Sequence, residues 1–295
     1  MALAIGVDIG GTKVAGGVVD GGGRVLAETR RATPSDDADA ALDAVVEVVR
    51  ELRAECDVAA VGVAAAGYVS ADRTTMLFAP NLPWADVPVR DRVAEAVDLP
   101  VVVENDANAA AWAESRFGAG RGEPDLVCLT VGTGIGAGIV VDGELYRGRF
   151  GIAGEPGHLT VVPDGIPCGC GNAGCLEQYA SGTALVRYAK ARGLDSDGPA
   201  IADAARDGDE RAVAAFAEVG EWLGRGLANV ATVLDPGLFV VGGGVADAGA
   251  LLLDPARASF ARHLSGAAHR PHADVRPAAL GNAAGLVGAA DLARR

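Results

Sequence analysis

Residues Ile5–Gly22 read IGVDIGGTKVAGGVVDGG, and residues Val127–Glu144 read VCLTVGTGIGAGIVVDGE. Aligned without gaps, the two stretches are identical at seven positions, from the pair Gly10 and Gly132 to the pair Gly21 and Gly143. Each has the pattern of a strand, a glycine-rich turn and a second strand. The alternative is a chance likeness between Gly- and Val-rich strands, but the repeat favours a duplicated structural unit.

The segments around this repeat alternate between strand and helix patterns. Strands are predicted at Leu3–Asp8, Lys13–Asp20, Arg24–Arg30, Val58–Val63, Pro100–Glu104 and Leu238–Val241. Apolar residues at helical spacing predict helices at Asp36–Glu55, Pro88–Val97, Asn105–Phe117, Glu210–Leu234, Gly249–His263 and Gly285–Arg294. The first three strands form an antiparallel meander, whereas the short apolar runs suit buried parallel strands. The pattern therefore predicts an α/β fold. We expect Arg192–Pro199, which is rich in Gly, Asp and Ser, to be its most flexible segment.

Composition limits the classes of function. A chain of 295 residues suggests about two domains of roughly 150 residues each. The formal charge of −14, without long basic runs, argues against a nucleic-acid partner. The start of the chain lacks a basic region before an apolar one, and no apolar stretch approaches the ~18–20 residues of a membrane helix, so we expect neither a leader nor a membrane partner.

Three of the five cysteines crowd into CGCGNAGC, Cys168–Cys175, and His158 precedes them. One His and three Cys can surround Zn²⁺ tetrahedrally, whereas scattered core cysteines would not be this dense. Four protein ligands leave no open position, so His158, Cys168, Cys170 and Cys175 predict a structural zinc site. Such thiols suit a reducing cytoplasm, where we expect the protein to reside. The site would also fix the interleaved carboxylates of Glu155 and Glu177.

Three predicted strands end in glycine-rich turns, at Asp8–Lys13, Gly132–Gly136 and Gly242–Gly244. Without a Cβ, glycine lets the backbone approach a phosphate and point its N–H groups at it. One such turn is common in ordinary hairpins, but three in one chain favour a nucleotide site. Neither the Walker nor the Rossmann glycine pattern is present, which argues against those folds.

The strand Pro100–Glu104 runs into Asn105 and Asp106. An acidic residue at this junction can simply cap the following helix. Asn105 already suits the cap, however, and the carboxyl ends of parallel strands are where α/β proteins bind ligands. A second carboxyl group there fits a base that accepts a proton from a hydroxyl during phosphoryl transfer.

Taken together, these motifs resemble the ROK family (repressors, open reading frames, kinases), and most closely its bacterial glucose-phosphorylating kinases. The most specific stretches are DIGGTK (8–13), APNLPW (79–84), ENDAN (104–108), GEPGH (154–158) and CGCGNAGCLE (168–177). The resemblance implies a two-lobed actin/hexokinase-like (ribonuclease H-like) fold with duplicated βββαβα units. We expect a smaller lobe of residues 1–108 plus 283–295, a larger lobe of 109–282 with the zinc loop, and an active-site cleft between them.

The resemblance also implies the residue roles and the activity, which is transfer of a phosphoryl group from ATP with Mg²⁺ to the 6-hydroxyl of glucose. Asp106 would be the catalytic base. Glucose hydroxyls would contact Asp106 and also Asn81, Asn105, Glu155, His158 and Glu177. The phosphates, magnesium and adenosine would lie near Asp8, Gly10, Gly11, Thr12, Lys13, Gly132, Thr133, Gly134, Gly243 and Gly244. Pro156 departs from the large apolar residue that such kinases often carry, and we expect it to shift the backbone near Glu155 slightly without abolishing binding.

Three alternatives stay open. The family includes sugar-sensing regulators, but those carry a helix-turn-helix ahead of the kinase-like part, for which we expect no room before Leu3. The hexose could instead be N-acetylglucosamine, N-acetylmannosamine or fructose. Polyphosphate could replace ATP, but it would favour a basic donor cleft that the sequence does not suggest. The resemblance further implies a homo-oligomer, either a dimer or a tetramer.

Overall fold

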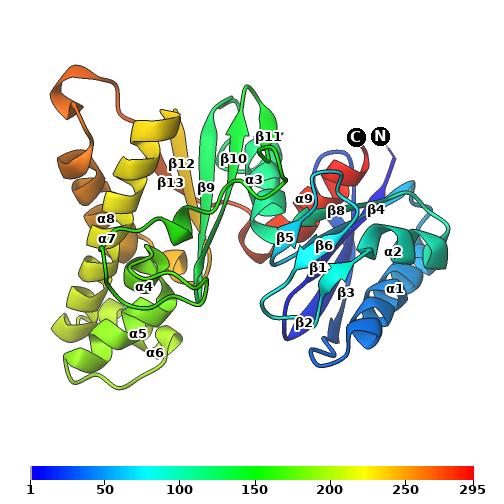
Figure 1. The fold of residues 1–295 in the computed structure, drawn as a ribbon, viewed down its shortest axis with the longest axis horizontal. Helices are drawn as coiled ribbons and strands as arrows, with labels where there is room; N and C mark the ends of the chain where they lie inside the picture. Colours follow the sequence, from blue (N-terminus) through cyan, green and yellow to red (C-terminus); the bar gives the residue numbers. More distant parts are fainter. Residues whose placement is uncertain (1) are drawn as a thin grey trace. The chain divides into compact units, whose positions relative to one another are not determined.

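The computed structural model describes residues 2–295, which divide into two compact units (Figure 1). Unit 1 comprises the chain up to Gly122 together with Gly138–Gly154 and Leu280–Arg295. Unit 2 comprises Glu123–Ala137 and Glu155–Ala279. Unit 1 thus extends past the predicted boundary at residue 108, because that boundary falls inside the helix Asp106–Phe117, which belongs to unit 1 as a whole.

Unit 1 is built on a five-stranded sheet with the order β3-β2-β1-β4-β8. The strands β1 (Ala4–Ile9), β2 (Lys13–Val19) and β3 (Val25–Ala32) form the predicted antiparallel meander. The strands β4 (Ala60–Ala65) and β8 (Val101–Asn105) continue the sheet in parallel with β1. The carboxyl ends of β1, β4 and β8 therefore meet at one edge of the sheet.

Helices cover both faces of this sheet. The helices α1 (Ala38–Glu55) and α2 (Val89–Val97) share one apolar core with β1, β2 and β4. On the other face, α3 (Asp106–Phe117) packs against the last helix, α9 (Ala284–Ala293). Glycine permits this closeness: a Cβ on Gly6 would stand 1.8 Å from the carbonyl oxygen of Leu286, and one on Gly62 would stand 1.9 Å from that of Ala289. The helix α9 thus lies directly on the backbone of β1 and β4.

A second sheet has the order β11-β10-β9-β12-β13. Its strands are β9 (Leu126–Val131), β10 (Ile135–Val141), β11 (Glu144–Tyr146), β12 (Leu238–Gly242) and β13 (Asp274–Pro277). Each boundary of β9 and β10 lies 122 positions after the matching boundary of β1 and β2. In both sheets two parallel strands follow the meander on the same side. The predicted duplication is confirmed.

Helices of unit 2 complete its core. They are α4 (Glu177–Ala180), α5 (Gly182–Ala191), α6 (Gly198–Arg206), α7 (Glu210–Leu234) and α8 (Ala250–His263). The long helix α7 has the predicted bounds, and its face at Gly220 and Gly224 packs closely on α8. Short 3-10 turns lie at Pro156–His158, Ala246–Ala248 and Ala267–His269, and a fourth, Gly281–Ala283, lies in unit 1.

Some elements were not predicted. Unit 1 contains a small antiparallel sheet of β5 (Tyr68–Val69), β6 (Met76–Phe78) and β7 (Ala85–Val87), whose strands are too short to show a period. The helices α5 and α6 were also missed, and α6 begins inside the segment Arg192–Pro199. Asp197 caps α6 by accepting a hydrogen bond from the backbone N–H of Ala200, so a Gly/Asp/Ser-rich stretch supplies a helix start.

Candidate functional site

Two carboxyl groups interact at the edge of the unit 1 sheet where the parallel strands end. Asp8 lies near the end of β1, and Asp106 begins α3 directly after β8. Burial and the charge of Asp106 raise the pKa of Asp8 to about 6, although Lys13 opposes the shift. Burial also raises the pKa of Asp106, and the backbone N–H of Ala107 partly offsets this by donating to its Oδ1 at 2.9 Å. A carboxyl group with a raised pKa is a better proton acceptor.

Asn105 takes the capping role that Asp106 could have had. Its Oδ1 accepts a hydrogen bond from the backbone N–H of Asn108 at 2.9 Å, so Asn105 is the N-cap of α3. Its Nδ2 donates to the carbonyl oxygen of Gly67 at 3.0 Å. The expectation that Asn105 suits the cap is confirmed, and most of its side-chain amide is engaged within the protein.

The first predicted phosphate turn, Asp8–Lys13, begins with one of these carboxyl groups, and Asp106 interacts with that group in the fold. The N–H of Gly10 donates to the carbonyl oxygen of Lys13 at 3.0 Å and closes the turn. Thr33 clamps the turn from the chain just after β3, since its hydroxyl donates to the carbonyl oxygen of Gly10 at 2.7 Å. A Cβ on Gly11 would stand 3.0 Å from the Cβ of Asn81, so this predicted sugar ligand lies against the turn. Unit 1 thus brings all its predicted site residues to one edge.

In unit 2 the other two glycine-rich turns line one cavity of about 680 Å³. Gly132 and Thr133 follow β9, and Gly244 follows β12. Gly243 has a positive φ of 89°, and a Cβ there would stand only 2.5 Å from the carbonyl oxygen of Val131, so the position requires glycine. A volume of this size matches that of ordinary small-molecule sites.

The sequence does not predict several residues of this cavity. The hydroxyl of Thr183 donates to the carbonyl oxygen of Thr133 at 2.8 Å, and the N–H of Gly182 donates to that of Gly132 at 2.7 Å. The start of α5 therefore holds the turn in place. Helices α5, α6 and α7 supply the other wall, including Pro199, Ala202, Arg206 and Phe216. A Ser-Gly-Thr start at Ser181–Thr183 was the available signal, and it is common at ordinary helix caps.

The predicted zinc ligands of unit 2 converge. The ligand atoms of His158, Cys168, Cys170 and Cys175 all lie within 4.8 Å of one another. The Sγ atoms of Cys170 and Cys175 are 3.6 Å apart, and Cys168 Sγ lies 3.7 Å from His158 Nδ1. Zn–S bonds of about 2.3 Å in a tetrahedron require edges of about 3.8 Å. The four residues therefore fit a tetrahedral zinc ion.

Two predicted sugar ligands lie beside this cluster. Glu177 Oε1 accepts from Cys168 Sγ at 3.0 Å, and its Oε2 faces the turn at Gly134. Nδ1 of His158 faces Cys168, whereas its Nε2 lies 3.9 Å from Glu155 Oε2. The cluster therefore holds both carboxylates near one imidazole, as the interleaving in the sequence indicates.

Pro156 is accommodated without disturbing this loop. It is the buried first residue of the 3-10 turn Pro156–His158. The N–H at the first position of a helix has no acceptor within the helix, so proline loses no hydrogen bond there. The N–H of His158 donates to the carbonyl oxygen of Glu155 at 3.1 Å and closes the turn. The departure from the family pattern therefore suits the local backbone.

Comparisons with known proteins find similarity along almost the whole chain. The profile of the ROK family matches residues 4–295. The glucokinase of Streptomyces coelicolor is 50% identical over 312 aligned residues, which cover 100% of this chain and 98% of that protein.

Two solved structures are similar throughout. The ROK family glucokinase from Streptomyces griseus, in complex with glucose and AMPPNP, has a TM-score of 0.91 and 55% identity, with 99% of both chains covered. The ROK hexokinase from Thermus thermophilus has a TM-score of 0.84 and 38% identity over 99% of this chain and 98% of that one. The expected fold class is therefore confirmed.

Proposed function

Because this chain belongs to the ROK family, we propose that it transfers the γ-phosphoryl group of ATP to the 6-hydroxyl of glucose, giving glucose 6-phosphate and ADP. The observation that carries the proposal is the division of roles at the end of β8. Asn105 caps α3, so the half-buried carboxyl group of Asp106 is available for chemistry. Full-length similarity to glucokinases supports glucose as the acceptor.

Asp106 is the proposed general base. Its carboxylate orients the 6-hydroxyl of glucose and accepts the proton as the oxygen attacks the γ-phosphorus. The raised pKa of Asp106 favours proton acceptance, and the fixed position at the first residue of α3 favours orientation. Phosphoryl transfer depends mainly on such positioning and on electrostatic stabilisation.

The cavity of unit 2 is the proposed nucleotide site. Backbone N–H groups of the Gly132–Gly134 turn would receive the phosphates, and Gly243 and Gly244 would lie beside the adenosine. The residues that line the cavity, all of which the structure describes, include one arginine and two aspartates. That balance supports a nucleotide rather than a polyphosphate chain, which would need a row of cations.

The carboxylates of Glu155 and Glu177, with His158 and Asn81, are the proposed ligands of the glucose hydroxyls. Each hydroxyl both donates and accepts, so acceptor-rich carboxylates suit it, and an unpaired polar group would cost about 1–3 kcal/mol. Zn²⁺ bound by His158, Cys168, Cys170 and Cys175 would be structural and would fix this loop. The ring of His158 would then contact both the zinc ion and the sugar.

Mg²⁺ fits the carboxyl pair of unit 1. Hard cations prefer carboxylate oxygens, and the mutual repulsion of Asp8 and Asp106 marks a place where positive charge is favourable. A bound Mg²⁺ would neutralise charge on the transferred phosphoryl group. Lys13 and the turn Gly10–Thr12 would supply further contacts to the phosphates.

A coupled assay with ATP across a panel of hexoses tests the proposal. Glucose should give the highest kcat/KM, above fructose, N-acetylglucosamine and N-acetylmannosamine. A higher value for another hexose, or turnover with polyphosphate in place of ATP, would support the corresponding alternative. Sugar binding without turnover of any hexose would instead indicate a regulator.

The resemblance also predicts a cytoplasmic homo-oligomer, a dimer or a tetramer, without a nucleic-acid partner. Light scattering on the purified protein tests the oligomeric state. A gel-shift experiment at low salt tests for DNA binding. Among the helices that residues 2–295 form, none is both long and apolar enough to cross a membrane.

A further inference from the structure

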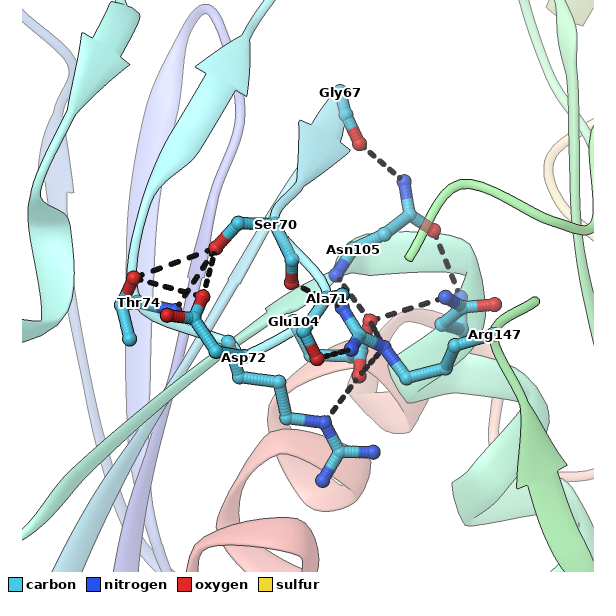
Figure 2. A network of polar contacts seen from close by, with 10 residues as sticks. Gly67, Ser70, Ala71, Asp72, Thr74, Glu104, Asn105 and Arg147 are labelled. Atoms are coloured by element: carbon cyan, nitrogen blue, oxygen red, sulfur yellow. Dashed lines mark hydrogen bonds and ion pairs between the residues drawn. The ribbon is translucent and has the colours of Figure 1, made fainter. Parts of the chain in front are cut away.

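A buried carboxylate that the proposed mechanism does not use lies at the end of β8. Glu104 is 1% exposed and stands two residues before Asp106. Its Oε1 accepts hydrogen bonds from the backbone N–H of Asn105 at 2.9 Å and from Nδ2 of Asn108 at 3.0 Å (Figure 2). The Glu104 side chain therefore ties together the last residues of β8 and the first turn of α3.

Arg147 neutralises this carboxylate and links it to a loop. Its Nε lies 2.9 Å from Glu104 Oε2, while its Nη1 and Nη2 donate to the carbonyl oxygens of Ala71 and Ser70 at 2.8 and 3.0 Å (Figure 2). All three guanidinium nitrogens thus have partners, and the side chain is only 10% exposed. Arg73 adds a second ion pair at 3.1 Å but is 29% exposed. A planar guanidinium can hold such a set of acceptors, whereas an ammonium cannot.

The backbone of Arg147 fixes a different segment. Its carbonyl oxygen accepts from the N–H of Ala153 at 3.1 Å, which closes the loop two residues before Glu155. Gly151 within this loop has a φ of 86°, and a Cβ there would stand 2.6 Å from the carbonyl oxygen of Val69. The loop is thus packed against the end of β5, just before the carbonyls that the side chain holds.

We propose that Arg147, through its ion pair with Glu104, is a positioning residue for both the base Asp106 and the sugar ligand Glu155. Its side chain orders the junction before Asp106. The same side-chain contacts anchor the backbone of residue 147, whose carbonyl oxygen holds the chain before Glu155. The inference rests on the proposed roles of those two residues. Loss of Arg147 should lower kcat and raise the KM for glucose. The KM for ATP should not change, because the nucleotide cavity lies in unit 2, outside this network.

The test compares Arg147→Met, Glu104→Gln and the double variant with the control Arg149→Met. Arg149 is exposed, lies two residues along the same segment and has no ion pair or hydrogen bond with any residue of the described chain. Arg147→Met should lower Tm, lower kcat at least tenfold and raise the glucose KM. The double variant removes both buried charges, so its Tm should recover while kcat and the glucose KM stay impaired. The control Arg149→Met should match the wild type in Tm, kcat and glucose KM.

Two outcomes would overturn the proposal. One is recovery of kcat together with Tm in the double variant, which would make the pair purely structural. The other is a wild-type glucose KM in folded Arg147→Met. Hydrogen exchange provides a measurement that does not depend on activity: residues 105–108 and 153–155 should both exchange faster in Arg147→Met than in Arg149→Met. If the wild type does not phosphorylate glucose, the proposed function fails, and unchanged exchange in these two segments would still refute the positioning role.

Discussion

Replacing Asp106 by Asn tests the proposed general base, because the change removes one charge while the size of the side chain stays the same. A positioned base contributes about 10²–10⁴ in rate, so kcat should fall at least ~10²-fold, or about 2.7 kcal/mol in the barrier. Stability should hardly change. Asn105 remains the helix cap, and the amide oxygen that Asp106→Asn introduces can still accept from the N–H of Ala107.

The change also removes the charge that helps to raise the pKa of Asp8, so Tm at pH 7 should be equal to or above that of the wild type. A coupled assay gives kcat and KM, and thermal unfolding gives Tm. Asp91→Asn is the matched control, because Asp91 is an exposed acid in the first turn of α2 and its loss should leave kcat unchanged. Turnover by Asp106→Asn within about threefold of the wild type would refute the role of Asp106 as the base and the interpretation of the strand edge that rests on it.

Three further predictions concern the metal, the carboxyl pair and the packing. Cys170→Ala should lose zinc by metal analysis, unfold at lower temperature and bind glucose more weakly, whereas Cys56→Ala should keep its zinc; an unchanged metal content in Cys170→Ala would contradict the site. The pKa of Asp8 is about 6 in the folded protein against an ordinary value of 3.8, so its contribution to stability should fall by up to about 3 kcal/mol as pH rises from about 4 to about 6. In urea titrations, Asp8→Asn should show a smaller decline in stability over this pH range than the wild type, and it should also lower kcat. A decline as steep as that of the wild type would contradict the raised pKa of Asp8. Gly62→Ala should destabilise the protein by about 3 kcal/mol or more, because the new methyl would overlap the carbonyl oxygen of Ala289, and a wild-type urea midpoint would contradict this packing.

The sequence predicts the parts of this fold that repeat or that have a clear period. The hairpins at Gly10 and Gly132 are identified by their likeness to each other, and α7 by its apolar spacing. The strands β5, β6 and β7 are missed because two or three residues carry no periodicity. The helices α5 and α6 are missed because their glycine and proline starts resemble loops.

The candidate site likewise contains residues that the sequence predicts and residues that it does not. The zinc ligands are visible because His158 and three cysteines are close in sequence and chemically distinctive. The pair of Glu104 and Arg147 is invisible, because its members are 43 residues apart and arginines and glutamates are common on surfaces. Only the fold shows that this carboxylate is buried and that its partners come from three segments.

The placement of α9 has a consequence for how the protein is made. This helix supplies the buried residues Leu286, Val287 and Ala290 that cover one face of the first sheet, yet it is translated only after the whole of unit 2. Chains emerge from the ribosome at about 5–20 residues per second, and domains generally fold as units as they emerge. Unit 2 lies wholly within residues 123–279, so it can fold during synthesis. Unit 1 begins first, but one face of its sheet stays uncovered until α9 has been made, after all of unit 2. Nascent chains, and truncated chains that lack α9, therefore expose apolar surface that chaperones can bind.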